Sequence, residues 1–353
     1  MVDGAAPRRR GRGARAGSVP GRGAPLARAC DALLEATVIG GFSRVGYQIR
    51  RAVEGWEEPA RIDGAVVVVT GASSGIGRAV ALALAGRGAE VVALGRDARR
   101  TAAVAGEISS RGGRAEAIVI DLTDGASVAR ACERIAAGHT RLDGLVHCAG
   151  TLLGEYAVSG EGLERTVATH VVGPFRLTGQ LARLLWAADR STIVTMSSGG
   201  MYSERFDLAH LVMSEEDYDG VRAYARAKRA QVVLAHEWAR RWSAHGVASY
   251  AMHPGWVATP GLASALPRFS RLGVLLRRPE EGADTAVWLA CGGPRPGGAG
   301  APGAGRSCEE GIWHDRHLRR EHYLPWTRPV GGRAEQGQQL WEWCARHAEE
   351  GGR

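Results

Sequence analysis

A glycine-rich turn between a run of valines and an alanine-rich stretch constrains the fold of this chain more than any other feature. The run Val66–Val69 predicts a buried strand. Glycines spaced as in the following turn let the backbone approach a pyrophosphate at a helix N-terminus, where free N–H groups favour negative charge, although glycine also suits an ordinary turn. The turn predicts a dinucleotide site, and its candidate residues are Gly71, Ser73, Ser74, Gly75, Ile76 and Gly77.

Short apolar runs alternate with helical stretches along the rest of the central region. Continuous apolar strands separated by helices are typical of parallel strands that are buried on both faces. The fold class expected is therefore α/β, a doubly wound, Rossmann-like parallel sheet in a single domain with terminal extensions. The strands are expected at residues 65–70, 90–95, 115–120, 142–147, 192–197 and 247–253.

Composition divides the chain further. Residues 1–28 hold seven arginines and one acid, so they supply most of the net charge of +8. Residues 26–56 show a helical apolar pattern interrupted at Gly40 and Gly41, which either packs on the domain or lies on a membrane surface. The expected organisation is a disordered basic arm at 1–25, a helical extension at 26–58, a catalytic domain at 59–291, a low-complexity loop at 292–306 and a packed C-terminal extension at 307–353.

These features also exclude several classes of protein. Because the positive charge belongs mainly to the arm, nucleic acid is not an expected partner. No apolar run is long enough to span a bilayer, so membrane contact is at most peripheral. The six cysteines are scattered without metal-ligand spacing, which indicates reduced thiols, no metal site and a cytoplasmic location.

The second and third expected strands end in residues suited to the adenosine half of a dinucleotide. Arg96 follows the second strand where NAD-binding proteins carry an acid, and a guanidinium there suits a 2′-phosphate. NADP(H) is therefore favoured over NAD(H), although Asp97 directly behind Arg96 weakens the preference. Asp121, at the end of the third strand, is expected either to contact the adenine or to cap a helix.

A tyrosine and a lysine stand four residues apart on an expected helix. Tyr224 and Lys228 therefore project from one face. A phenol with a pKa of about 10 is a poor base at neutral pH, and a neighbouring ammonium lowers that pKa. Lys228 is the only lysine in a chain with 44 arginines, and arginine does not replace a compact ammonium. The pair is thus a candidate acid/base centre.

Together, the glycine turn, Ala149-Gly150, Ser197-Ser198, the Tyr224–Lys228 pair and the stretch from Pro254 to Thr259 resemble the short-chain dehydrogenase/reductase family over residues 60–290. The resemblance implies an NAD(P)-dependent, homo-oligomeric enzyme. In it, Ser198 would bind the substrate oxygen, Tyr224 would transfer its proton, and Lys228 would hold the nicotinamide ribose. The other cofactor contacts that it implies are Ala149, Gly150, Tyr224, Pro254, Gly255, Val257 and Thr259.

Finer motifs are similar to those of the subfamily called dehydrogenase/reductase family member twelve, namely SSGGM at 197–201, HPGW at 253–256 and GAD at 282–284. Two positions depart from the wider family. The family's Asn-Ala-Gly turn reads His147-Cys148-Ala149-Gly150 here, and His170 stands where an asparagine usually serves the proton relay. Histidine both donates and accepts protons, so His170 either preserves the relay or lowers activity.

The expected activity is hydride transfer between the cofactor and a small apolar carbonyl or alcohol. An apolar substrate is expected because an apolar segment follows the sixth strand. This segment forms either a lid over the site or an ordinary core helix. The alternative function is an NADP(H)-binding sensor or interaction protein with little turnover. The lid candidates are Trp256, Leu262, Leu266, Phe269, Leu272, Val274, Leu275 and Leu276.

Overall fold

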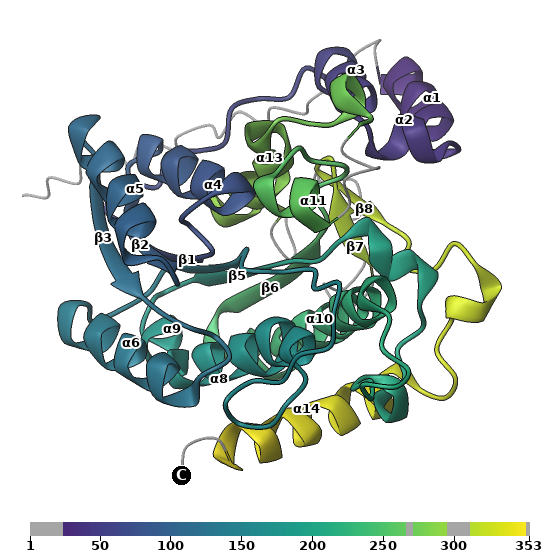
Figure 1. Cartoon of the computed structure of the whole chain (residues 1–353). Helices are drawn as coiled ribbons and strands as arrows, with labels where there is room; N and C mark the ends of the chain where they lie inside the picture. The colour runs from purple at the N-terminus through teal and green to yellow at the C-terminus, as the bar shows by residue number, and fades with distance from the viewer. Residues whose placement is uncertain (1–23, 266–270, 295–310, 351–353) are drawn as a thin grey trace, which may run out of the picture.

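The computed structural model describes residues 24–265, 271–294 and 311–350. Eight strands form one sheet in the order β3-β2-β1-β4-β5-β6-β7-β8, in which all neighbours are parallel except β7 and β8 (Figure 1). The strands are β1 Val66–Thr70, β2 Glu90–Gly95, β3 Arg114–Val119, β4 Gly144–His147, β5 Ser191–Met196, β6 Val247–Met252, β7 Ile312–His314 and β8 His317–Arg319. The Rossmann-like α/β fold is confirmed, and each of the six expected strands is present within two residues of its expected bounds.

Helices cover both faces of the sheet (Figure 1). α4 (Gly75–Gly86), α5 (Ala98–Ser110) and α13 (Pro279–Ala290) pack on one face. The opposite face carries α6 (Gly125–Gly138), α7 (Arg165–Val167), α8 (Gly173–Gln180), α9 (Ala182–Trp186) and the long α10 (Gly220–Trp242), with a π-helix at Ala168–Val172 between α7 and α8. Short 3₁₀ turns lie at Gly199–Ser203, Leu208–His210, Ser243–His245, Gly273–Leu275 and Pro325–Thr327.

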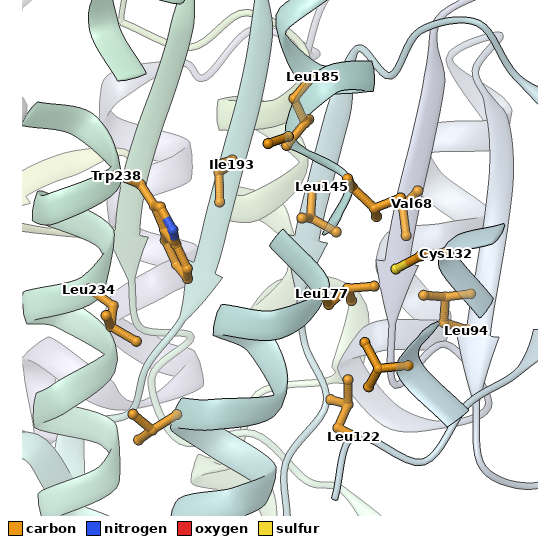
Figure 2. Close-up of a cluster of buried hydrophobic side chains, with 14 of the residues drawn as sticks. Val68, Leu94, Leu122, Cys132, Leu145, Leu177, Leu185, Ile193, Leu234 and Trp238 are labelled. Carbon is orange, nitrogen blue, oxygen red and sulfur yellow. The ribbon is translucent and has the colours of Figure 1, made fainter. Parts of the chain in front are cut away.

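The larger core lies between the sheet and α6, α8 and α10. Figure 2 shows Leu145 of β4 and Ile193 of β5 with Leu177 of α8 and Trp238 of α10 in this layer. These side chains are at most 1% exposed, and burying one Leu-sized side chain contributes about 1.5–3 kcal/mol. The core thus fixes α10, which carries the Tyr-Lys pair, against the centre of the sheet.

Three helices precede the sheet: α1 (Ala24–Glu35), α2 (Val38–Phe42) and α3 (Arg44–Glu54). The expected interruption at Gly40 and Gly41 is wrong, because both glycines lie inside α2. The breaks fall before α2 and α3, where the hydroxyls of Thr37 and Ser43 accept hydrogen bonds from backbone N–H groups and cap the helices. The arm at residues 1–23 lies outside the described residues.

The C-terminal region adds a hairpin and a helix to the domain. β7 extends the sheet beyond β6, and α14 (Arg333–Glu350) packs on α10 and α8, burying Leu340 and Cys344 completely. The strands β7 and β8 were not anticipated from the sequence. Most of the low-complexity loop, together with Cys308, lies outside the described residues. No helix among the described residues is long and apolar enough to cross a membrane.

Candidate active site

One large cavity of about 1260 Å³ opens at the carboxyl ends of β1, β4, β5 and β6. β1 pairs with β2 on one side and β4 on the other, so the chain reverses its winding there, and ligands of open α/β sheets bind at such a switch point. The cavity brings together every predicted cofactor residue and three of the four predicted catalytic residues. His170 is the exception, because it does not line the cavity.

The glycine turn leaves room for a phosphate group in front of α4. Gly71 has φ +67, and a Cβ on it would lie 2.8 Å from the Cα of Ala149, so a larger residue there would collide with the neighbouring strand end. Ser74 is the N-cap of α4, yet its side chain makes no capping hydrogen bond. The backbone N–H groups at this helix end are thus free of a side-chain cap, an arrangement that fits a pyrophosphate.

Two arginines meet at the adenosine end of the cavity. Arg96 follows β2 and Arg100 lies in α5, and neither makes an ion pair with any described residue. The carboxylate of Asp97 accepts a hydrogen bond from the backbone N–H of Arg100 at 2.9 Å and caps α5. Asp97 is therefore engaged in capping, whereas the two guanidiniums remain available to an anion.

Asp121 lines the cavity, but its carboxylate is already partly engaged. Its Oδ1 accepts hydrogen bonds from the backbone N–H of Thr123 at 2.9 Å and from the Thr123 hydroxyl at 2.8 Å. The N-cap of α6 is instead Asp124. Asp121 thus shapes the turn after β3, and the helix-capping interpretation of it is wrong.

Ser198 and Tyr224 face each other across the cavity floor. The hydroxyl of Ser198 accepts a hydrogen bond from the backbone N–H of Gly200 at 3.3 Å, which orients it after β5. Burial raises the pKa of Tyr224, and the hydrogen bond from Ser198 partly opposes that rise. In the chain alone, burial outweighs the lowering of the pKa expected from Lys228, and Tyr224 is a phenol that keeps its proton at neutral pH.

Lys228 lies beneath Tyr224, with its Nζ 5.5 Å from the centre of the phenol ring. The Nζ donates hydrogen bonds to the carbonyl of Met196 and to Oε1 of Gln231, both at 2.9 Å. Burial lowers the pKa of Lys228 to about 7. The Met196 carbonyl and the Gln231 side chain therefore hold the Lys228 amine beside the phenol of Tyr224. Neither group is a carboxylate, so neither would neutralise the charge of the amine.

The histidines of the two stretches that depart from the family's pattern, His147 and His170, are both buried. His170 lies in the π-helix, with its ring 5.3 Å from that of Tyr224 and its Nε2 2.8 Å from the carbonyl of Thr151. The Nε2 of His147 lies 2.8 Å from the hydroxyl of Thr178. Burial, reinforced by the charge of Lys228, lowers the pKa of each imidazole to about 3, so both rings are neutral.

The loop after β6 is held in place by the N-terminal extension. The carbonyl of Phe42 accepts a hydrogen bond from the backbone N–H of Trp256 at 2.9 Å. Arg277 donates to the carbonyls of Phe42 and Pro254, and its guanidinium pairs with Asp315 at 2.5 Å. Both side chains of this pair are 1% exposed, so a buried ion pair joins α2, the β7–β8 turn and the predicted nicotinamide loop.

Sequence reasoning missed the residues that the terminal extensions contribute to the cavity wall. Phe42 of α2 stacks on His253 with ring centres 4.9 Å apart, and Tyr202 meets Phe42 edge-on. Tyr323 and Leu324, from the segment after β8, close the same wall. The aromatic residues near the C-terminus were visible in the sequence, but their distance along the chain from the motifs gave no reason to place them here.

The expected greasy lid is only partly present. α11 (Pro260–Ala265) begins at the cavity, and Trp256 and Leu262 line it. Leu276 is buried, whereas Val274 is 84% exposed and points away from any core. Leu266 and Phe269 lie outside the described residues. The described residues of the segment are therefore divided between the cavity wall, the core and the surface.

Comparison with known proteins agrees with this geometry. Residues 65–268 match the family described as short chain dehydrogenase. The chain is 36% identical to dehydrogenase/reductase SDR family member 12 of Bos taurus over 234 residues, which covers 65% of this chain and 73% of the relative.

Solved structures show the same relationship. A putative NAD(P)-dependent gluconate 5-dehydrogenase from Beutenbergia cavernae, with bound NADP at low occupancy, is 31% identical, with a TM-score of 0.55 over 66% of this chain and 91% of that one. A putative uncharacterized protein from Mycobacterium paratuberculosis is 27% identical, with a TM-score of 0.60 over 83% of this chain and 96% of the other.

Proposed function

Because the chain belongs to the short-chain dehydrogenase family of oxidoreductases, we propose that it reduces an apolar aldehyde or ketone with NADPH, using Tyr224 as the proton donor. The observation that carries this proposal is the placement of Ser198, Tyr224 and Lys228 on one cavity whose other end carries the glycine turn. Residues from four strand ends thus converge where a nicotinamide and a carbonyl would meet.

The protonation of Tyr224 favours the reductive direction. A reduced nicotinamide bound beside Lys228 would supply the hydride to the carbonyl carbon. Tyr224, whose pKa is raised by burial, keeps its proton at neutral pH and donates it to the carbonyl oxygen, which Ser198 positions by a hydrogen bond. The positive charge of Lys228, 5.5 Å from the ring, stabilises the phenolate that remains.

The preference for NADPH rests on Arg96 and Arg100. Both guanidiniums lie on the cavity with no described carboxylate paired to them, and a 2′-phosphate accepts charge-assisted hydrogen bonds from such groups. Replacing both by alanine is expected to raise the Kd for NADPH by about tenfold or more and to leave the Kd for NADH unchanged, as measured by fluorescence titration. Equal weakening of the two cofactors would contradict the assignment.

The substrate class follows from the apolar side chains that line the cavity. Phe42, Leu152, Val221, Trp256 and Leu262 give part of the cavity an apolar lining. An apolar wall favours a lipophilic carbonyl compound over a sugar, because hydroxyls would lose hydrogen bonds to water without replacement.

The decisive experiment is turnover of NADPH with a panel of lipophilic aldehydes and ketones by wild type and by Tyr224→Phe. Loss of the proton donor is expected to slow turnover by about a hundredfold or more, while NADPH binding persists. Tyr202→Phe is the matched control, since Tyr202 lines the same cavity. Full turnover by Tyr224→Phe would refute the mechanism.

A further inference from the structure

The three N-terminal helices expose many of their large apolar side chains. Of the 17 large apolar side chains that are exposed among the described residues, seven lie in α1–α3. Two of these, Leu33 and Val38, are 73% and 65% exposed. We name the seven residues the N-terminal apolar surface: Leu26, Leu33, Val38, Ile39, Val45, Ile49 and Val53.

Their spacing produces stripes on the helices. Leu26 and Leu33 are seven residues apart on α1, and Val45, Ile49 and Val53 follow one another at intervals of four on α3. Residues at these intervals share a helix face. α1, α2 and α3 also pack on one another, so the stripes belong to one helical unit, which lies far from β3 in Figure 1.

The acidic residues of α1 are turned away from solvent. Asp31 and Glu35 pair with the guanidiniums of Arg50 and Arg319, whose side chains are 0% and 9% exposed. By contrast, the sequence from residue 1 to 28 carries seven arginines and one acid. In the sequence, a strongly basic stretch therefore precedes and overlaps the start of the helices that carry the apolar surface, a combination that complements an anionic lipid bilayer.

The cavity mouth opens beside the same surface. Val38, Val221, Tyr323 and Leu324 line the cavity and are also among the exposed large apolar residues, so they form the rim of its mouth. The hydroxyl of Tyr323 donates a hydrogen bond to Glu35 and ties the C-terminal part of the rim to α1. These four side chains give a lipophilic molecule an apolar part of the rim to enter across.

We propose that the N-terminal apolar surface seats the protein on an anionic bilayer, so that the cavity mouth faces the lipid and takes its carbonyl substrate from it. The part about the substrate rests on the function proposed above. A bilayer explains these observations better than a second copy of the chain does. A second copy of the chain bound to α1 and α2 would cover Val38 and so block this part of the cavity rim. A bilayer at the same place would instead supply a lipophilic substrate to the cavity.

The test is sedimentation of the full chain with vesicles of phosphatidylcholine alone or of phosphatidylcholine with phosphatidylserine. The wild-type protein is expected to sediment with the anionic vesicles, and added salt should weaken binding because it screens the arginines. The double variant Leu33→Asp with Ile39→Asp should bind about tenfold or more weakly. The matched control is Val119→Asp with Val158→Asp, which adds the same charge at two exposed valines outside the N-terminal apolar surface.

Sedimentation and turnover separate this inference from the proposed function. The membrane inference would be overturned if the wild type stayed in solution with both vesicle types. It would also be overturned if the two double variants bound anionic vesicles equally well. A second result would also overturn the inference. In it, the wild type binds no vesicles and forms a dimer in ultracentrifugation, and Leu33→Asp with Ile39→Asp dissociates that dimer. A protein that binds vesicles but turns over no carbonyl compound would support the surface and refute the enzyme. In an active protein, the Leu33–Ile39 double variant should raise KM for a long-chain aldehyde dissolved in vesicles and not for a short water-soluble one.

Discussion

Replacing Asp315 with asparagine tests whether the buried ion pair holds the N-terminal extension on the domain. Asp315 pairs with Arg277 at 2.5 Å and with Arg50 at 2.8 Å, and all three side chains are at most 1% exposed. Asp315 has φ +49, in the left-handed region, and asparagine tolerates this conformation better than most residues do. The substitution therefore removes the charge and leaves the β7–β8 turn intact.

The loss of stability expected for Asp315→Asn depends on which hydrogen bonds Arg277 keeps. Removing one partner of a buried ion pair costs about 3–5 kcal/mol, because the other charge is left uncompensated. The amide oxygen of asparagine still accepts a hydrogen bond, and Arg277 keeps its bonds to the carbonyls of Phe42 and Pro254. We therefore expect the free energy of unfolding to fall by about 2–3 kcal/mol.

The pH dependence has a definite sign. Burial by itself would raise the pKa of Asp315, but the charges of Arg277, His314 and Arg50 outweigh it and hold that pKa far below its ordinary value. Such a carboxylate stabilises the fold above the unfolded-state pKa of about 3.9 and loses this effect as the pH falls towards the folded-state pKa. The difference between wild type and Asp315→Asn should be constant from about pH 5 upwards and should shrink below about pH 4.

The assay is denaturant unfolding followed by tryptophan fluorescence, with Asp63→Asn as the control. Asp63 pairs with Arg61, and both side chains are more than 60% exposed, so solvent screens the pair and its loss is expected to change the free energy of unfolding little. If Asp315→Asn were no more destabilising than this control, the buried pair would not hold the extension in place.

Three further predictions concern the cavity. The kcat/KM for NADPH should fall above about pH 7, because burial lowers the pKa of Lys228 to about 7 and its charge is lost there; a flat profile from pH 6 to 9 would contradict this. His170→Leu should slow turnover by about a hundredfold, whereas His170→Asn should stay within about tenfold of wild type if the imidazole relays protons; equal rates for both variants would exclude that role. Phe42→Ala should raise KM for bulky lipophilic substrates and leave the Kd for NADPH near the wild-type value, so an effect on NADPH binding alone would place Phe42 outside the substrate wall.

Local patterns were enough to place the strands and the reactive pair. The run Val66–Val69 became β1, and the spacing of Tyr224 and Lys228 put both side chains on the cavity face of α10. Such features depend on helix and strand periods, which a sequence carries directly. The glycine turn belongs to the same class, since its conformation is set by residues next to one another.

Two local interpretations failed for a physical reason. Gly40 and Gly41 were expected to break a helix, but Thr37 and Ser43 supply hydroxyl caps, and these caps decide where the helices begin. The pKa of Tyr224 was expected to fall beside Lys228, yet burial raises it. Its direction depends on desolvation, which the sequence does not record.

Patterns among neighbouring residues were sufficient to predict the α/β alternation, the glycine turn and the family. They did not predict that Phe42, Tyr323 and Leu324 close the cavity or that Arg277 and Asp315 hold the extension against it. Arg277 meets Phe42 across 235 positions of the chain. Contacts at such separations arise from packing of the whole sheet and its helices, and no local period encodes them.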